Sequence, residues 1–145
     1  MEIELKFTVP DKTTCERLQE TEQLAGFLLS TGHYQDLHDT YLDTAAQDLQ
    51  KAGYICRKRE QADATVISLK QLIPPAGTLH RREEFAVSLS SPTLEPTLWP
   101  DSQTRSLVLQ FTQHKPLIPL FEVRQKRFVR RVRSRGERLV AELCI

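Results

Sequence analysis

The sequence predicts an α+β fold, mainly antiparallel β, in which a β-barrel with a polar interior carries peripheral helices. Successive segments of the 145-residue chain alternate apolar and charged residues with the period of a strand. Turn-forming residues separate these segments, which favours successive hairpins and a barrel. The length suits one globular domain, so we expect residues 1–145 to form a single domain.

The predicted strands are distributed along the whole chain. The first covers residues 2–9, where Glu2, Glu4 and Lys6 share one face and apolar residues the other. A proline-rich segment, 91–118, is expected to be a helical excursion between strands. Hairpin turns are expected at 61–63 and 134–137. The remaining strands are expected at 38–44, 53–60, 64–72, 79–89, 119–133 and 138–145.

A helix is predicted after the first strand. Thr13 and Glu16 fit a capping box that follows Pro10, and Gly32 would end the helix after a break near Gly26. Its apolar side would comprise Leu18, Leu24, Phe27 and Leu28.

Composition narrows the function classes. The net charge of +1 argues neither for nor against an anionic partner. Three scattered cysteines, Cys15, Cys56 and Cys144, fit a reducing compartment better than a disulfide framework or a zinc site. The N-terminus lacks the apolar stretch of a signal peptide, and no segment approaches the roughly 20 apolar residues of a membrane span. We therefore expect a cytoplasmic protein with no membrane partner.

Charged residues recur on one face of strand after strand. Burying so many cations without a partner would be costly, so the face must hold water, paired carboxylates or a bound polyanion. A triphosphate supplies the missing negative charge, since arginine and lysine suit phosphate oxygens and carboxylates suit Mg²⁺ or Mn²⁺. The residues of this face are Glu2, Glu4, Lys6, Arg57, Arg59, Lys70, Arg82, Glu84 and Glu142.

Each element taken alone has a simpler explanation. The charges of residues 2–6 suit a solvated edge strand, and those of 57–59 suit a surface basic strand. Arg82 and Glu84 could be surface ion-pair partners. The basic run 124–138 could bind nucleic acid, but a strand splits its residues between two faces and Phe128 is its only aromatic residue. Joint occurrence on several strands favours the polyanion site, with nucleic acid the less favoured partner.

Several motifs, taken in order, resemble one known family. Glu2-Ile-Glu-Leu-Lys6 is similar to the ExExK signature of CYTH-domain proteins, the triphosphate tunnel metalloenzymes. This signature is the sharpest of the matches, and the order of the others adds to it. They are Tyr41-Leu-Asp-Thr44, the segment from Gly53 to Arg59, Ser68-Leu-Lys70, Arg82-Glu-Glu84, the basic residues Arg124 and Arg127, and Ala141-Glu-Leu-Cys-Ile145.

The resemblance implies a triphosphate-tunnel barrel that hydrolyses inorganic triphosphate with Mg²⁺ or Mn²⁺. It implies metal binding by Glu2, Glu4 and Glu142. Lys6 or Glu84 would act as the catalytic base. Phosphate would be bound by Lys6, Arg57, Arg59, Lys70, Arg82, Arg124 and Arg127.

The resemblance also implies a wider context. Within the family, Gly77 to Glu84 and the stretch Leu94 to Pro100 look most like bacterial inorganic triphosphatases that carry a C-terminal CHAD domain. Family members continue beyond the position of Ile145 with a final strand, so we expect the barrel to lack that strand and the open edge to allow homodimerisation. The alternatives are a polyphosphate- or nucleotide-binding module without turnover, a class IV adenylate cyclase and a thiamine triphosphatase.

Overall fold

The structure is a computed structural model that describes residues 2–61, 64–74 and 77–145, without the side chain of Glu2. It divides into two compact units: unit 1 comprises residues 1–6 and 37–124, and unit 2 comprises residues 7–36 and 125–145. The turn expected at 61–63 lies outside the described residues, except for Gln61.

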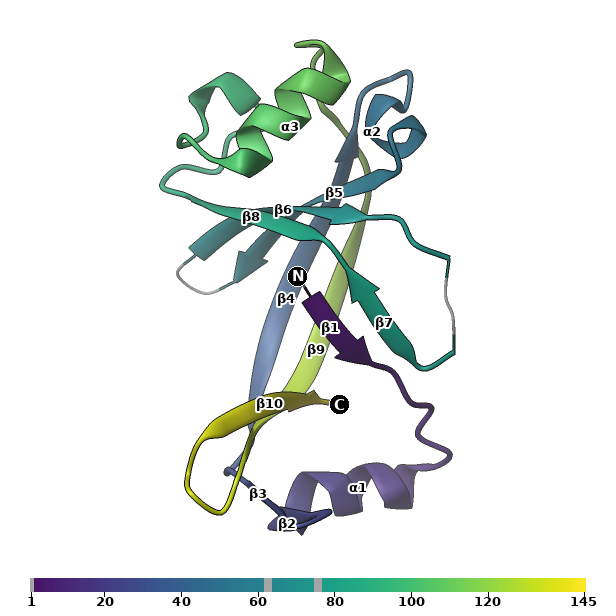
Figure 1. Cartoon of the computed structure of the whole chain (residues 1–145), viewed down its shortest axis with the longest axis vertical. Coiled ribbons are helices and arrows are strands. Elements are labelled where there is room, and N and C mark those ends of the chain that lie inside the picture. Colours follow the sequence, from purple (N-terminus) through teal and green to yellow (C-terminus); the bar gives the residue numbers. More distant parts are fainter. Residues whose placement is uncertain (1, 62–63, 75–76) are drawn as a thin grey trace. The chain divides into compact units, whose positions relative to one another are not determined.

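Unit 1 contains most of the strands and two of the helices (Figure 1). Two long strands, β4 (His33–Asp43) and β9 (Ile118–Arg133), continue into unit 2. The other elements of unit 1 are β1 (Glu2–Leu5), α2 (Asp48–Lys51), β5 (Tyr54–Gln61), β6 (Ala64–Gln71), β7 (Leu79–Arg82), β8 (Glu84–Leu89), the 3₁₀ helix η1 (Pro96–Leu98) and α3 (Gln103–Thr112).

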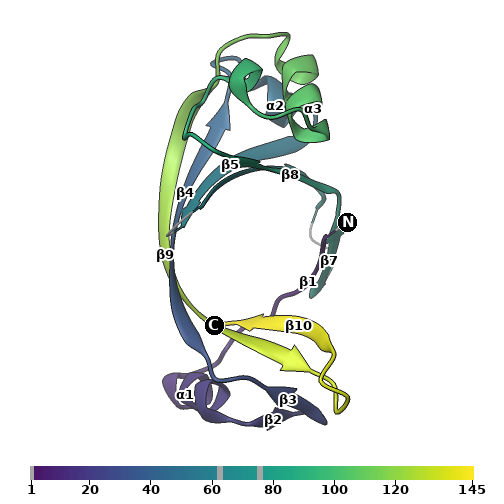
Figure 2. The ribbon, with the colours of Figure 1, turned by 90° about the vertical axis from the view of Figure 1, so that its left-hand side faces the viewer.

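The strands of unit 1 form one long antiparallel ladder and one short one. The long ladder has the order β9-β4-β5-β6-β8, and β1 pairs only with β7. Figure 2 shows β1 and β7 side by side. The prediction of a mainly antiparallel β structure with peripheral helices is confirmed. Among the described strands the ladder stays open, because no pairing connects β8 back to β9.

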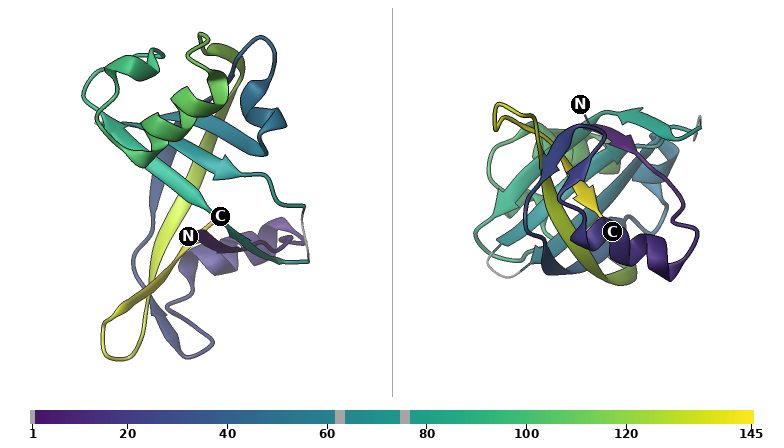
Figure 3. Two further views of the ribbon diagram at one scale, coloured as in Figure 1. Left: turned by 45° about the horizontal axis from the view of Figure 1, so that its top comes forward. Right: turned by 90° about the horizontal axis from the view of Figure 1, so that it is seen from below.

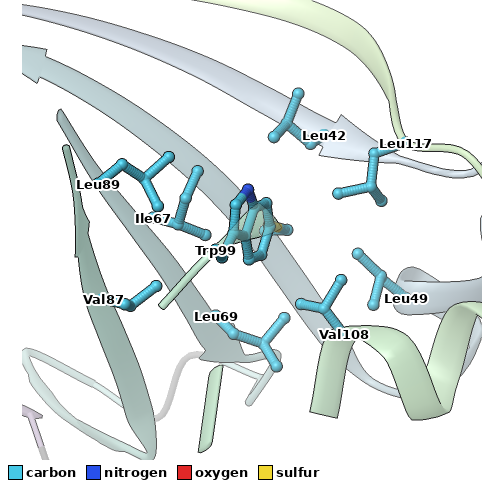
Figure 4. Packing of buried hydrophobic residues seen from close by; sticks show 10 residues of the cluster. Leu42, Leu49, Ile67, Leu69, Val87, Leu89, Trp99, Val108 and Leu117 are labelled. Carbon is cyan, nitrogen blue, oxygen red and sulfur yellow. The ribbon is translucent and has the colours of Figure 1, made fainter. Parts of the chain in front are cut away.

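Helices cover one face of the long ladder. Figure 3 shows α3 packed across β6 and β8, the strands that its contacts involve. Trp99 lies at the centre of the core, only 2% exposed, and its indole nitrogen donates to the carbonyl of Thr93 at 3.0 Å. Around it pack Leu42, Leu49, Ile67, Leu69, Val87, Leu89, Val108 and Leu117 (Figure 4). Burial of these side chains is the main favourable term that holds unit 1 together.

Unit 2 contains α1 (Lys12–Glu20), β2 (Gln23–Leu24), β3 (Phe27–Leu29) and β10 (Leu139–Cys144). β10 forms the expected hairpin with β9 through residues 134–137, and β3 pairs with the end of β9. In Figure 2 α1 and the hairpin of β2 and β3 are drawn close to one another.

The prediction of one long helix after the first strand was wrong for the second half of that helix. α1 ends at Glu20, and the residues that follow form the β2–β3 hairpin. Ala25 and Gly26 both have positive φ, 50° and 82°, which is the backbone of a tight hairpin turn. The cap also differs: the side chain of Asp11, not that of Thr13, accepts a hydrogen bond from the amide of Thr14 at 2.7 Å.

Some strand boundaries also differ from the prediction. β1 ends at Leu5 instead of residue 9, and the pairing continues beyond it with a hydrogen bond from the amide of Lys6 to the carbonyl of Thr78 at 2.9 Å. The strand expected at 79–89 is two strands separated at Glu83, since β7 pairs with β1 while β8 pairs with β6. The strand expected at 38–44 is also longer, because β4 begins at His33. β5, β6, β9 and β10 lie close to the expected ranges.

The short helix α2 was not predicted. It follows Asp43, a buried carboxylate that accepts hydrogen bonds from the amides of Thr44, Leu49 and Gln50 at 2.7, 2.9 and 3.0 Å. Thr44 in turn donates to Asp48. The Tyr41-Leu-Asp-Thr44 motif therefore ends in residues that anchor a helix start.

Candidate functional site

The face of the ladder opposite the core carries ionic side chains. Because successive side chains of a strand point to opposite faces, Arg57 and Arg59 lie across from the face that contains Cys56. Register places Asp39 opposite Arg59, and both Tyr41 and Ser68 opposite Arg57. Lys70 pairs with Glu84 in the same way. We call the set Asp39, Tyr41, Arg57, Arg59, Ser68, Lys70 and Glu84 the charged face.

Arg59 and Asp39 form the tightest ion pair of the charged face. The Arg59 Nε and Nη2 atoms each lie 2.7 Å from one carboxylate oxygen of Asp39, a two-bond, side-on arrangement. Asp39 is buried, with 1% of its surface exposed. The hydrogen bond to Asp39 is the main cause that raises the pKa of Arg59, against the opposing effect of burial. This cation therefore has a close carboxylate partner within the chain.

Arg57, two residues earlier, is held more loosely. Its Nη1 lies 3.7 Å from Asp39 Oδ2 and its Nη2 lies 3.9 Å from Glu84 Oε1, beyond hydrogen-bond distance. Its buried Nε has no hydrogen-bond partner among the described residues. Burial, and then the nearby charge of Arg59, lower the pKa of Arg57, while Asp39, Tyr41 and Glu84 act in the opposite direction. Arg57 is therefore less completely neutralised than Arg59.

Two further polar groups lie beside Arg57. Lys70 Nζ is 3.2 Å from Glu84 Oε1, so that carboxylate lies between a lysine and Arg57. Ser68, directly opposite Arg57, is buried, and within the described part of the chain its hydroxyl has no hydrogen-bond partner. Buried polar atoms without a partner are uncommon, so each calls for a water or a ligand atom.

The β1–β7 pair carries a second ionic group. Glu4 Oε2 lies 3.4 Å from Lys6 Nζ and 3.5 Å from Arg82 Nη2. The same oxygen is buried and accepts no hydrogen bond from the described residues, so these contacts are ion pairs without aligned hydrogens. Glu2 pairs with Arg82 through the backbone register.

Together these contacts join five cations to three carboxylates, all in unit 1. Cations outnumber carboxylates among these side-chain contacts of the described residues, which is the charge balance that suits an anionic ligand. Sequence reasoning placed these cations on one face of the strands but did not include Asp39. Asp39 shares the alternation of Tyr41, and only the register of β4 against β5 places it opposite Arg59.

Arg124 lies in β9, on the face of the sheet opposite the charged face. Phe121 stacks on Tyr41 with ring centroids 4.6 Å apart, which places Phe121 on the charged face. Its neighbour Glu122 contacts His38 at 2.9 Å on the opposite face. Because Arg124 is two residues beyond Glu122, alternation puts it on that opposite face, where it is exposed.

Arg127 and Glu142 belong to unit 2. Arg127 Nε donates to the side chain of Gln125 at 2.9 Å, and Glu142 in β10 pairs with Arg131 by register. Arg130 of the same basic run is buried and donates to the carbonyls of Ser30 and Leu18 at 2.8 and 2.9 Å. That arginine stabilises unit 2, so the run 124–138 is not a uniform basic surface.

Carboxylate oxygens are the donors that Mg²⁺ and Mn²⁺ prefer. The unpartnered oxygen of Glu4 fits such an ion by its chemistry, although Lys6 and Arg82 close by disfavour a bare cation there. Over residues 2–61, 64–74 and 77–145, no group of three or more His, Cys, Asp or Glu side chains is placed to hold a metal. Among those residues there is also no helix with the length and apolarity of a membrane span.

The model of the CYTH domain family matches residues 1–143, nearly the whole chain. This chain belongs to the CYTH-domain family. No curated protein sequence matches this CYTH domain significantly. The family assignment agrees with the ordered motifs of the sequence, of which the N-terminal signature, Glu2 to Lys6, is the sharpest.

Two solved structures share the fold of this CYTH domain. One is HpAC1 from Hippeastrum, a candidate adenylyl cyclase described as having a dominant triphosphatase activity; it is 22% identical, with a TM-score of 0.71, and the match covers 90% of this chain and 67% of that one. The other is a candidate adenylate cyclase from Bacillus halodurans, 20% identical, with a TM-score of 0.55, where the match covers 99% of this chain and 75% of that one. At these identities the likeness concerns the fold.

Proposed function

We propose that the charged face and the β1–β7 pair bind inorganic triphosphate, and that the protein hydrolyses it to pyrophosphate and phosphate with the help of Mg²⁺ or Mn²⁺. The observation that carries this proposal is the incomplete neutralisation of Arg57. Its nearest carboxylates are 3.7 and 3.9 Å away, and its buried Nε has no hydrogen-bond partner among the described residues. A buried cation in this state is stabilised by an anion that brings several acceptor oxygens.

Triphosphate fits the spread of cations better than a single phosphate does. Arg57, Arg59 and Lys70 extend along two paired strands, and Lys6 and Arg82 flank Glu4 at the β1–β7 pair. A chain of linked phosphates can meet several such cations at once. Membership in the CYTH family and the described activity of HpAC1 support this choice of substrate.

In the proposed reaction the cations neutralise the phosphate chain and stabilise the charge that develops as the terminal phosphoryl group is transferred to water. Lys6 and Glu84 are the proposed candidates for orienting that water and accepting its proton. Lys6 lies 3.4 Å from Glu4, and Glu84 lies 3.2 Å from Lys70. Arg127 is a further proposed phosphate ligand, whereas the alternation of β9 disfavours Arg124.

Glu2, Glu4 and Glu142 are the proposed metal ligands, and a bound divalent ion would supply polarisation of the phosphoryl oxygens. Glu4 stands between two cations, which repel a metal ion unless phosphates compensate them. We therefore expect Mg²⁺ or Mn²⁺ to bind much more tightly in the presence of triphosphate than alone.

The test is phosphate release from inorganic triphosphate, ATP and thiamine triphosphate, with Mg²⁺, Mn²⁺ or a chelator. We expect metal-dependent release, fastest from inorganic triphosphate. Glu4→Gln should weaken metal binding and Arg59→Ala should weaken triphosphate binding while the thermal transition persists. Unchanged binding in both variants would refute the assignment of the site.

The same assay separates the remaining functions. Triphosphate binding without release under any metal would indicate a polyphosphate-binding module. Formation of cyclic AMP from ATP would indicate a cyclase, the activity for which the two structural neighbours were named. Preferential release from thiamine triphosphate would indicate a thiamine triphosphatase.

A further inference from the structure

Asp39 is the most deeply buried acidic group of the charged face, and its place is unusual for a site that binds anions. Its carboxylate has 1% of its surface exposed and lies on the same face as Arg57 and Arg59. A negative charge at this position repels a bound phosphate, so by electrostatics alone it should weaken binding. Its presence therefore needs a compensating function.

The geometry supplies one. Asp39 holds Arg59 by the Nε and Nη2 edge, with both distances 2.7 Å. A guanidinium has five N–H donors in a rigid plane, and this side-on pair uses one donor from each of those two atoms. Both hydrogens of Nη1 remain outside the pair. The carboxylate thus fixes the plane of the guanidinium without occupying its remaining donors.

The surroundings of Asp39 include a second cation. Arg57 lies 3.7 Å from the same carboxylate oxygen that Arg59 Nη2 contacts, so one buried carboxylate faces two cations. Only one of the two is bound tightly. The hydrogen bond to Asp39 also raises the pKa of Arg59, which keeps that cation fully charged. Arg57 retains its unpartnered Nε for another acceptor.

We propose that Asp39 is a positioning residue: it locks the guanidinium of Arg59 in a fixed plane so that Arg59 and Arg57 together bind the phosphate chain. This inference rests on the proposed function, because it names how one residue of that site acts through another. An arginine that is ordered in advance loses less rotamer freedom when the ligand binds, and this gain exceeds the repulsion from the carboxylate.

The first experiment is a double-mutant cycle with Asp39→Asn, Arg59→Ala and the double variant, with inorganic triphosphate titrated in chelator by calorimetry. Asp39→Asn removes negative charge yet should weaken triphosphate binding by about tenfold, since a fixed charge-assisted contact is lost. In the Arg59→Ala background the same replacement should no longer weaken triphosphate binding, because the positioning effect of Asp39 acts through Arg59. If Asp39→Asn binds triphosphate more tightly, the carboxylate only reduces charge and the inference is overturned.

Asp39→Asn leaves Arg59 half-buried without its partner and could destabilise the fold, so a second variant is needed. Asp39→Glu keeps the negative charge but moves the carboxylate by one methylene group. Weaker triphosphate binding by Asp39→Glu supports positioning, whereas wild-type affinity means that only the charge matters.

A third measurement does not depend on triphosphate. In the wild-type protein the Nε–H of Arg59 should give a sharp NMR signal that exchanges slowly with water, and Asp39→Asn should abolish it. Persistence of that signal in Asp39→Asn overturns the inference even if the protein binds no triphosphate. Absence of triphosphate binding by the wild-type protein would instead count against the proposed function, so the two failures are distinguishable.

Discussion

The two faces of the β5–β6–β8 ladder are built from alternating residues of the same strands, yet they use opposite physical principles. On one face Ile67 and Leu69 are fully buried beneath Trp99 and α3, and their energy comes from removing apolar surface from water. On the other face Arg57 and Lys70 meet carboxylates at distances from 3.2 to 3.9 Å, with a buried donor left unpartnered within the described residues. The first face is complete without a ligand, whereas the second carries the incompletely neutralised arginine on which the proposed triphosphate site rests.

The largest expected effect concerns the apolar face. Ile67→Ala should cost about 2–5 kcal/mol of unfolding free energy, because it leaves a cavity in a fully buried site. Val66→Ala, one residue earlier on the charged face and half-buried, should cost about 1 kcal/mol. Urea unfolding of both variants measures the difference. Equal losses would mean that the two faces contribute alike to stability.

The next effect concerns triphosphate affinity, for which we expect the charged face to matter more than the opposite face. Arg57→Ala should weaken triphosphate binding by roughly 10- to 100-fold, the equivalent of about 1.5–3 kcal/mol for a charged hydrogen bond. Lys58→Ala is the matched control: it removes a cation from the adjacent residue on the opposite face, where Lys58 Nζ pairs with Glu60 at 3.2 Å. Calorimetry should show little change for the control. If both variants lost a similar amount of triphosphate affinity, binding would depend on the overall positive charge and not on the position of Arg57.

A smaller effect concerns the pH dependence of stability, through the carboxyl group of Asp48. Hydrogen bonds from Thr44 and then Lys115 lower the pKa of Asp48 below its ordinary value of 3.8. A lowered folded-state pKa means that Asp48 stabilises the fold above pH 3.8 and that this contribution is lost as the pH falls through the folded value. Asp48→Asn should therefore reduce Tm at pH 6, and the difference from wild type should narrow as the pH falls below 3.8. A constant difference across this range contradicts the assignment.

The smallest effect is chemical. Burial raises the pKa of the Cys56 thiol to about 12, so at neutral pH it is protonated and inert. Cys144 is exposed. A thiol reagent should label Cys144 quickly and Cys56 only after unfolding. Because Cys15 is a third free and partly exposed thiol, the double variant Cys15→Ser, Cys144→Ser isolates the slow reaction. Rapid labelling of Cys56 in the native protein would show that the apolar face opens.

The sequence predicted β5 and β6 well because both have clear alternation and distinct turn residues at their ends. The second half of the first helix failed for a physical reason: Leu24, Phe27 and Leu28 have the spacing of a helical stripe and equally that of a short hairpin. The positive φ angles of Ala25 and Gly26 distinguish the hairpin from the helix, and these angles cannot be read from the spacing of apolar residues. α2 was missed because Asp43, which anchors it, lies before the helix in a strand.

The candidate site was predictable to the extent that it consists of repeated charges at strand spacing. Arg57, Arg59 and Lys70 follow from that pattern alone. Asp39 did not, because a single acid in an expected strand reads as a solvated residue until the register places it against Arg59. The separation of Arg124 from the charged face likewise depends on where β9 begins its alternation, which the contacts of Phe121 and Glu122 define.

The pairing of β1 with β7 has a consequence for how the protein is made. Leu5 pairs with Leu79 and Glu2 with Arg82, so the N-terminal strand finds its only described partner after half of the chain has been synthesised. Closing so long a loop carries an entropic cost that must be met before the contact forms. β1 is therefore synthesised well before the strand that places it, so Glu4 and Lys6 reach their positions only once β7 is available for pairing.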